Sequence, residues 1–288
     1  MLPAVGSAAL SPIEVAAVTV PLALFLMLAC TAVGTLLTTE ALRRLGGLTP
    51  GFLKFMSATS TVLSGLALLV VVSAPVDAYH DVLQIARGPA GWLPAFQGIT
   101  TAAFAGLSIS SFSRRVDPRP ARGAALLASA ALLVALALTF QPLSRSWWGS
   151  VAIWAAILLG TAVLGTATTG MLLGHWYLVT PALTNRPLLR SILWLLAALA
   201  VQAIFFPLAL AGLPGSAGSP AHALAANPIL AGLWGLGAVI LPLLAAGLAY
   251  PACRMRSFMS ATGLLYLAMI AIFPGQLVGQ LLLFVAAA

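Results

Sequence analysis

Hydrophobic residues follow one another along this chain in long continuous runs, separated by short polar stretches. A run of roughly 20 residues is long enough for a helix to cross a bilayer core of about 30 Å. Such runs cover residues 13–38, 52–73, 94–112, 123–140, 149–179, 188–212, 228–250 and 258–286. The pattern predicts an all-α fold, a polytopic integral membrane bundle of about eight transmembrane helices that forms a single domain over residues 1–288.

Two of these runs depart from a uniform apolar pattern. The run 94–112 is rich in Ser, Thr and Gly, so we expect its helix to be buried among neighbouring helices rather than to face lipid. The last run contains Pro274 and Gly275, which predict either a kink or an end at that point.

Composition agrees with a membrane location and indicates an orientation. Hydrophobic residues make up 61% of the chain and charged residues 6%, with a mean hydropathy of +1.09, which excludes a soluble globular domain. The 13 basic residues lie in short connections or at the ends of the runs and, except for Arg87 and Arg145, on one side of the predicted bundle. The positive-inside rule therefore predicts that both termini face outward in a bacterial cytoplasmic (inner) membrane. Nucleic-acid binding is not expected, and membrane lipids are the expected surroundings.

Catalytic and cofactor motifs are missing from the sequence. The five acidic residues map near helix ends or in connections, and no hydrolase or nucleotide-binding motif is present. His80 and His222 fall in outer loops and His175 near the inner end of a helix, so no two of them lie on facing helices at matching depth, as ligands of one haem would. We expect no metal site and no cofactor held by the chain's own ligands, and at most a non-catalytic or quinol-interacting subunit of an oxidoreductase.

One candidate site lies at the inner end of the run 149–179. His175, Trp176 and Tyr177 follow one another there, after Gly170 and Gly174, whose spacing lets another helix approach closely. These three residues are candidates for a pocket or a partner contact. Ordinary interfacial anchoring by aromatic and basic residues is the favoured alternative, and both interpretations stay open.

A second candidate site lies in the outer connection after the second run. Asp77, His80, Asp81 and Gln84 are spaced by three to four residues and would share one face of a helix. Quinol oxidation needs such a protonatable cluster at the membrane surface, to take up two protons while the electrons leave to a redox partner. The alternative is a solvated loop whose charges have no special role.

Gln202 is the best polar candidate at the middle of the membrane. An amide at this depth makes a hydrogen bond between helices or lines the path of a small-molecule transporter or channel. The second interpretation would place the His175 region on the same path.

The layout of eight helices with few connecting residues resembles the NrfD-like family, the membrane-anchor subunits of polysulfide and dimethyl sulfoxide reductases. Two stretches carry the resemblance, SAPVDAY at Ser73–Tyr79 and GQLVGQ at Gly275–Gln280. They stand where the family has His-Leu-Gly-x-Pro-x-Arg-Ala and Gly-Glu-x-x-Gly-Arg, so Asp77, Gln276 and Gln280 replace an arginine, a glutamate and an arginine of the family. The resemblance implies a quinone-interacting or purely structural subunit that docks an iron–sulfur or cytochrome subunit, with Gln276 and Gln280 as hydrogen-bonding residues of a quinone pocket.

The sequence therefore favours a membrane subunit of a respiratory or photosynthetic electron-transfer complex, which provides a quinone pocket or a structural anchor. A small-molecule transporter or channel is the alternative. An assembly protein with an unknown partner is the third possibility.

Overall fold

The computed structural model describes residues 11–74, 76–85, 87–144, 146–180 and 184–288, and the described chain is helical without strands. The N-terminal half contains α1 (Pro12–Leu45), α2 (Pro50–Ser73), α3 (Val76–Leu83), α4 (Arg87–Phe112), α5 (Arg119–Phe140) and the short η1 (Gln141–Leu143). The C-terminal half contains α6 (Trp147–Val179), α7 (Arg186–Ala211), η2 (Pro214–Ser216), α8 (Pro220–Ala226), α9 (Pro228–Trp234), the π-helical η3 (Gly235–Ile240), α10 (Leu241–Arg254) and α11 (Phe258–Ala287).

The described chain has seven helical segments long and apolar enough to cross a membrane. They are α1, α2, α5 with η1, α6, α7, the continuous stretch from α9 through η3 to α10, and α11. The eighth long helix, α4, has 26 residues but is not among them, because Gln97 and several Ser and Thr residues lower its hydropathy. The prediction of eight spans is thus confirmed for seven by length and composition.

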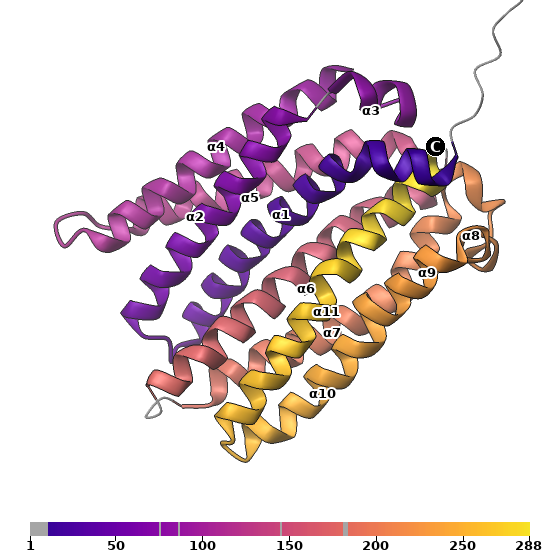
Figure 1. Cartoon of the computed structure of the whole chain (residues 1–288). Helices are drawn as coiled ribbons and strands as arrows, with labels where there is room; N and C mark the ends of the chain where they lie inside the picture. Colours follow the sequence, from indigo (N-terminus) through magenta and orange to yellow (C-terminus); the bar gives the residue numbers. More distant parts are fainter. Residues whose placement is uncertain (1–10, 75, 86, 145, 181–183) are drawn as a thin grey trace, which may run out of the picture.

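The long helices lie side by side in two groups of four (Figure 1). The first group packs α1 on α2, α2 on α4 and α4 on α5; the second packs α6 on α7, α7 on α10, and α10 and α6 on α11. The groups meet where α1 packs against α6 and α11, and these three are the most buried of the seven apolar segments. The short helices α3 and α8 lie apart from each other at the same end of the bundle (Figure 1). We call this the α3–α8 end.

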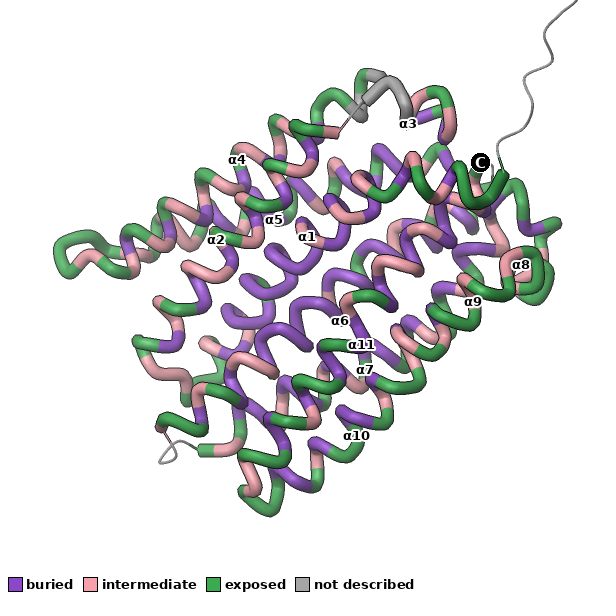
Figure 2. Tube along the Cα trace, viewed as in Figure 1, coloured by how far each residue is buried: buried purple, intermediate pink, exposed green. Residues whose placement is uncertain are grey.

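Many large apolar side chains are exposed on the outer surface of the bundle, as is usual for a protein surrounded by lipid. Figure 2 shows exposed positions along the outer helices and buried positions along α1 and α6. Large apolar side chains such as Leu69 on α2, Leu127 on α5 and Ile204 on α7 are 61–74% exposed. Polar Gln97 and Gln202 are almost fully buried. Apolar exposure on this scale is unfavourable in water and ordinary in lipid.

The helix α4 differs from the expectation that it would be surrounded by other helices. Its polar face is buried, since Gln97 Nε2 donates to the carbonyl and hydroxyl oxygens of Ser64 on α2, at 3.0 and 2.9 Å. Its other face is outward, with Ile99 61% and Ile109 72% exposed. The polar residues of α4 therefore lie on the face that contacts neighbouring helices. The apolar residues between them lie on the outer face.

Close contact between helix backbones fixes the centre of the bundle. A Cβ atom on Gly34 of α1 would overlap the carbonyl oxygen of Thr161 on α6, and one on Gly165 would overlap the backbone of Gly34. Gly275 of α11 is in similar contact with Gly237 of η3. Small residues allow such close approach, and dispersion contacts rather than the hydrophobic effect then hold helices together in lipid.

Several prolines lie in the first turn of a helix, and a proline inside a helix does not end it. Pro50 and Pro187 lie in the first turns of α2 and α7, where a missing N–H costs nothing. Pro274 lies inside α11, which continues to Ala287, so of the two sequence expectations, a kink or an end, the end is wrong. Neighbouring helices tolerate such interruptions inside a membrane bundle.

Candidate functional site: a carboxylate and arginine cluster

A buried carboxylate organises the end of the bundle opposite α3 and α8. Glu40 is 6% exposed and lies near the last turn of α1. Arg43 donates hydrogen bonds to both of its oxygens, from Nη2 to Oε1 at 2.5 Å and from Nε to Oε2 at 2.8 Å. The Nε atom of Arg44 lies 3.4 Å from Oε1. Spacings of three and four residues place these side chains on one helix face, which makes the two-point contact with Arg43 possible.

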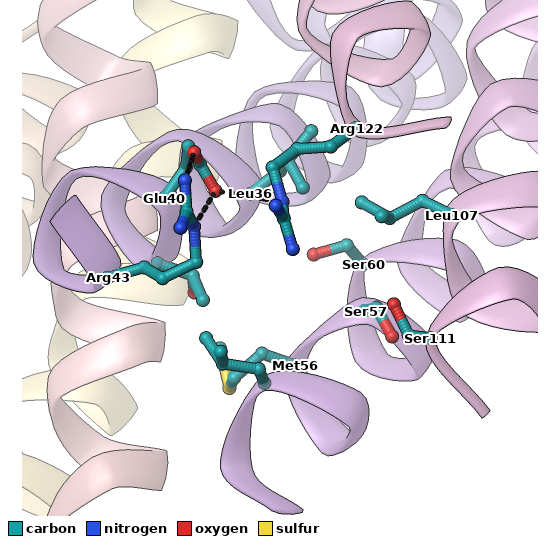
Figure 3. Close-up of a pocket in the computed structure, with 11 residues that line it drawn as sticks. Leu36, Glu40, Arg43, Met56, Ser57, Ser60, Leu107, Ser111 and Arg122 are labelled. Carbon is teal, nitrogen blue, oxygen red and sulfur yellow. Dashed lines mark hydrogen bonds and ion pairs between the residues drawn. The ribbon is translucent and has the colours of Figure 1, made fainter. Parts of the chain in front are cut away.

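A third arginine reaches the carboxylate from another helix. Arg122, in the first turn of α5, places its Nε 3.4 Å from Oε2 of Glu40. Figure 3 shows its guanidinium between Glu40 and Ser60. One carboxylate thus faces three guanidinium groups, so the cluster carries an excess of positive charge.

The cluster borders a hollow enclosed by α1, α2, α4 and α5, with an empty volume of about 350 Å³ that includes its open mouth (Figure 3). Its lining combines the ionic groups with hydroxyl and apolar side chains: Leu36, Thr39, Glu40, Arg43, Leu53, Met56, Ser57, Ser60, Leu107, Ser111 and Arg122. Among the described atoms, the hydroxyl oxygens of Thr39 and Ser60 are buried without a hydrogen-bond partner. The hollow therefore offers more donors than acceptors.

Sequence reasoning missed this cluster, because it placed Glu40 among acids near helix ends. The spacing Glu40, Arg43 and Arg44 is visible in the sequence and signals an ion pair on a helix surface. Burial of that pair and the contribution of Arg122 depend on how α1 and α5 pack, which the spacing does not contain.

The outer candidate residues lie on and beside α3. His80 is half-buried and its Nδ1 lies 2.8 Å from the carbonyl oxygen of Ile85, while Asp81 is exposed. The side chain of Asp77 lies outside the described residues. A hollow at this end, with an empty volume of about 540 Å³, is lined by Val82, Leu83 and Gln84 together with residues of η1, η2 and the C-terminus. His80 and Asp81 are not part of its lining.

The amide candidates prove to be partners of each other. Gln202 on α7 and Gln276 on α11 exchange two hydrogen bonds of 3.0 and 2.8 Å and are 2% and 3% exposed. Gln280 lies one turn further along α11 and is buried to a similar degree. Each amide donates one hydrogen bond to the other, which links α7 to α11 at this depth.

The side chains of residues 175–177 lie in three different environments. His175 is exposed, whereas Trp176 packs against Phe52 and Phe55 of α2 with ring centroids 5.7 and 6.1 Å apart. Tyr177 is fully buried, and its hydroxyl donates to the carbonyl oxygen of Thr184. The three side chains therefore do not converge on one pocket.

Neighbouring helices pack closely against the small residues before His175, as the spacing of those residues predicts. A Cβ atom on Gly170 would lie 2.9 Å from Ser191 Oγ of α7, and one on Gly174 would lie 2.8 Å from Thr262 Oγ1 of α11. The hydroxyl of Ser191 also donates to the carbonyl oxygen of Thr166 at 3.2 Å. This face of α6 thus packs against α7 and α11.

No three His, Cys, Asp or Glu side chains gather as metal ligands would within the described ranges. Compared with protein-family models and with curated protein sequences, the chain matches none.

Proposed function

We propose that this protein is a membrane subunit of a respiratory or photosynthetic electron-transfer complex, serving as the anchor for a redox partner and as part of a quinone-interacting surface. The observation that carries the proposal is the Gln202–Gln276 pair, which links α7 to α11 inside the bundle by two hydrogen bonds. The Gly34–Gly165 contact fixes α1 against α6 in the same way. Helices linked in these ways suit a scaffold, since transport requires helices that separate around a central site.

The orientation belongs to the same proposal. Eight helices including α4 cross a bacterial cytoplasmic membrane, with the α3–α8 end outside and the arginine-rich end inside. The inward hydrogen bonds of Gln97 support a crossing by α4, because they satisfy its most polar side chain within the bundle. Lys and Arg in the connections opposite the α3–α8 end support the orientation.

Quinone would meet the protein at the α3–α8 end. His80 offers a ring nitrogen besides the Nδ1 that faces Ile85, and Asp81 lies exposed beside it. Together with Asp77 they would pass protons to water. Because Gln276 is engaged with Gln202, its direct contact with quinone would require that pair to open, and the outer residues are the better candidates. The resemblance to NrfD-like anchors supports an iron–sulfur or cytochrome subunit as the partner.

A transporter or channel is the competing proposal, with Gln202 and His175 along a path. The exposure of His175 and the burial of Gln202 in a closed amide pair give that path no continuity. We therefore rank it second.

Replacement of His80 by alanine tests the quinone role. His80→Ala should lower quinol-dependent electron transfer of the intact complex at least several-fold while the amount of protein in the membrane stays unchanged. His222→Ala is the matched control, because His222 is an exposed histidine of α8 at the same end. Equal activity of both variants would remove His80 from the mechanism.

A further inference from the structure

The hollow beside Glu40 holds more positive charge than the described side chains in its lining neutralise. Glu40 is the one acidic residue in its lining, and Arg43 already occupies both of its oxygens. Arg122 pairs with it only through Nε, so within the described chain its terminal nitrogens have no acceptor. The side chain of Arg122 is 21% exposed, and such a partly desolvated cation is stabilised by a further anion.

Two residues with buried hydroxyl groups line the same hollow. Ser60 is 1% exposed and Thr39 is 7% exposed, and neither hydroxyl oxygen has a partner among the described atoms. In Figure 3 the hydroxyl of Ser60 points toward the guanidinium of Arg122. A buried hydroxyl without a partner is unfavourable, so a group that accepts hydrogen bonds from both residues would remove that cost.

We propose that this hollow binds a phosphate group, held by the guanidinium groups of Arg122 and Arg43 and by the hydroxyls of Ser60 and Thr39. A guanidinium donates two parallel hydrogen bonds to phosphate oxygens, and phosphate accepts several more from hydroxyls. The hollow is narrow but its mouth is open, so the phosphate group would lie at that mouth rather than in a closed cavity. This inference does not depend on the electron-transfer role.

The phosphate group has two possible sources, an anionic lipid headgroup and free phosphate. Basic pockets between membrane helices on the cytoplasmic side attract anionic headgroups, because that leaflet is negatively charged. A lipid would place its headgroup in the hollow and its acyl chains along the outer faces of the helices. Free phosphate would enter from the aqueous side.

Thermal unfolding of the full chain, delipidated in a neutral detergent, tests the proposal. The Tm is measured in sodium phosphate and in sodium chloride at equal ionic strength, and in micelles containing phosphatidylglycerol or a galactosyl diacylglycerol without phosphate. We expect a rise of about 3 °C or more with at least one phosphate-bearing probe. A rise with inorganic phosphate identifies free phosphate as a ligand, and a rise with phosphatidylglycerol alone identifies a headgroup. No rise with either probe overturns the proposal.

Three variants separate the hollow from general surface charge. Arg122→Gln should weaken binding of the effective probe about tenfold and Ser60→Ala about threefold. Arg119→Gln is the matched control, because Arg119 is an exposed arginine of the same helix outside the hollow, and it should leave affinity unchanged. Equal weakening in Arg119→Gln and Arg122→Gln overturns the site. If Arg122→Gln does not fold, unchanged affinity in Ser60→Ala overturns it.

Discussion

Arg122 on α5 and Glu40 on α1 form an ion pair, with Nε and Oε2 3.4 Å apart, between two helices that otherwise make few contacts. The pair closes the first group of four helices at the end opposite α3 and α8. Its carboxylate also balances Arg43 on its own helix. One acidic side chain thus supports both the end of α1 and the junction with α5.

Removal of that carboxylate should destabilise the bundle. Glu40→Ala leaves Arg43 and Arg122 facing each other, and we expect a loss of about 1–3 kcal/mol, less than for a fully buried pair because both arginines keep partial contact with water. Unfolding in detergent measures the loss. Asp117→Asn, which changes an exposed acid before α5, serves as the control. Equal stability of the two variants would show that the cluster contributes little.

The backbone contact between α1 and α6 should not tolerate a methyl group. Gly165→Ala forces the helices apart, at an expected cost of about 1–3 kcal/mol. Gly65→Ala on α2 is the control, because a Cβ atom there meets no other atom within 4 Å. The amount of folded protein and its Tm report the difference. If Gly165→Ala matched Gly65→Ala, the helices would not be held by this contact.

The amide pair should show strong coupling between its two positions. Gln202→Leu alone leaves Gln276 buried with no amide partner, and we expect a cost of about 1–2 kcal/mol. The double variant with Gln276→Leu should recover most of that loss, since both polar groups are then gone. A double-mutant cycle on unfolding free energies measures the coupling. If the two single substitutions lowered the free energy of unfolding additively, the result would contradict the pairing.

The orientation predicts which positions an impermeant thiol reagent reaches. In intact cells Asp81→Cys should be labelled, whereas Asp117→Cys should be labelled only after the membrane is opened, because α4 lies between them. Both residues are exposed, and the natural cysteines Cys30 and Cys253 are buried, which keeps the background low. Equal labelling of the two variants in intact cells would mean that α4 does not cross.

The sequence predicts the long helices well because each is an uninterrupted apolar run, as in α6, whose bounds Trp147–Val179 differ by two residues from the expected 149–179. The short helices α3 and α8 carry no such run: α8 was not predicted, and a helix at α3 was considered only because of the spacing of its polar residues. Gln202 and Gln276 were each identified as candidates, but their pairing joins positions 74 residues apart and depends on how α7 packs on α11. The contact between Glu40 and Arg122 could not be predicted for the same reason. Helix packing in lipid is specified by shape rather than by the hydrophobic pattern.

Isolation of the native protein in mild detergent tests the central claim, that this chain anchors a redox partner. Mass spectrometry identifies the copurifying subunits, and a visible absorption spectrum of the same fraction detects haem or iron–sulfur clusters. The account predicts at least one redox subunit at a constant ratio to the chain, together with the corresponding absorption. A colourless protein that purifies without a partner would contradict the anchor role and would make transport the working hypothesis.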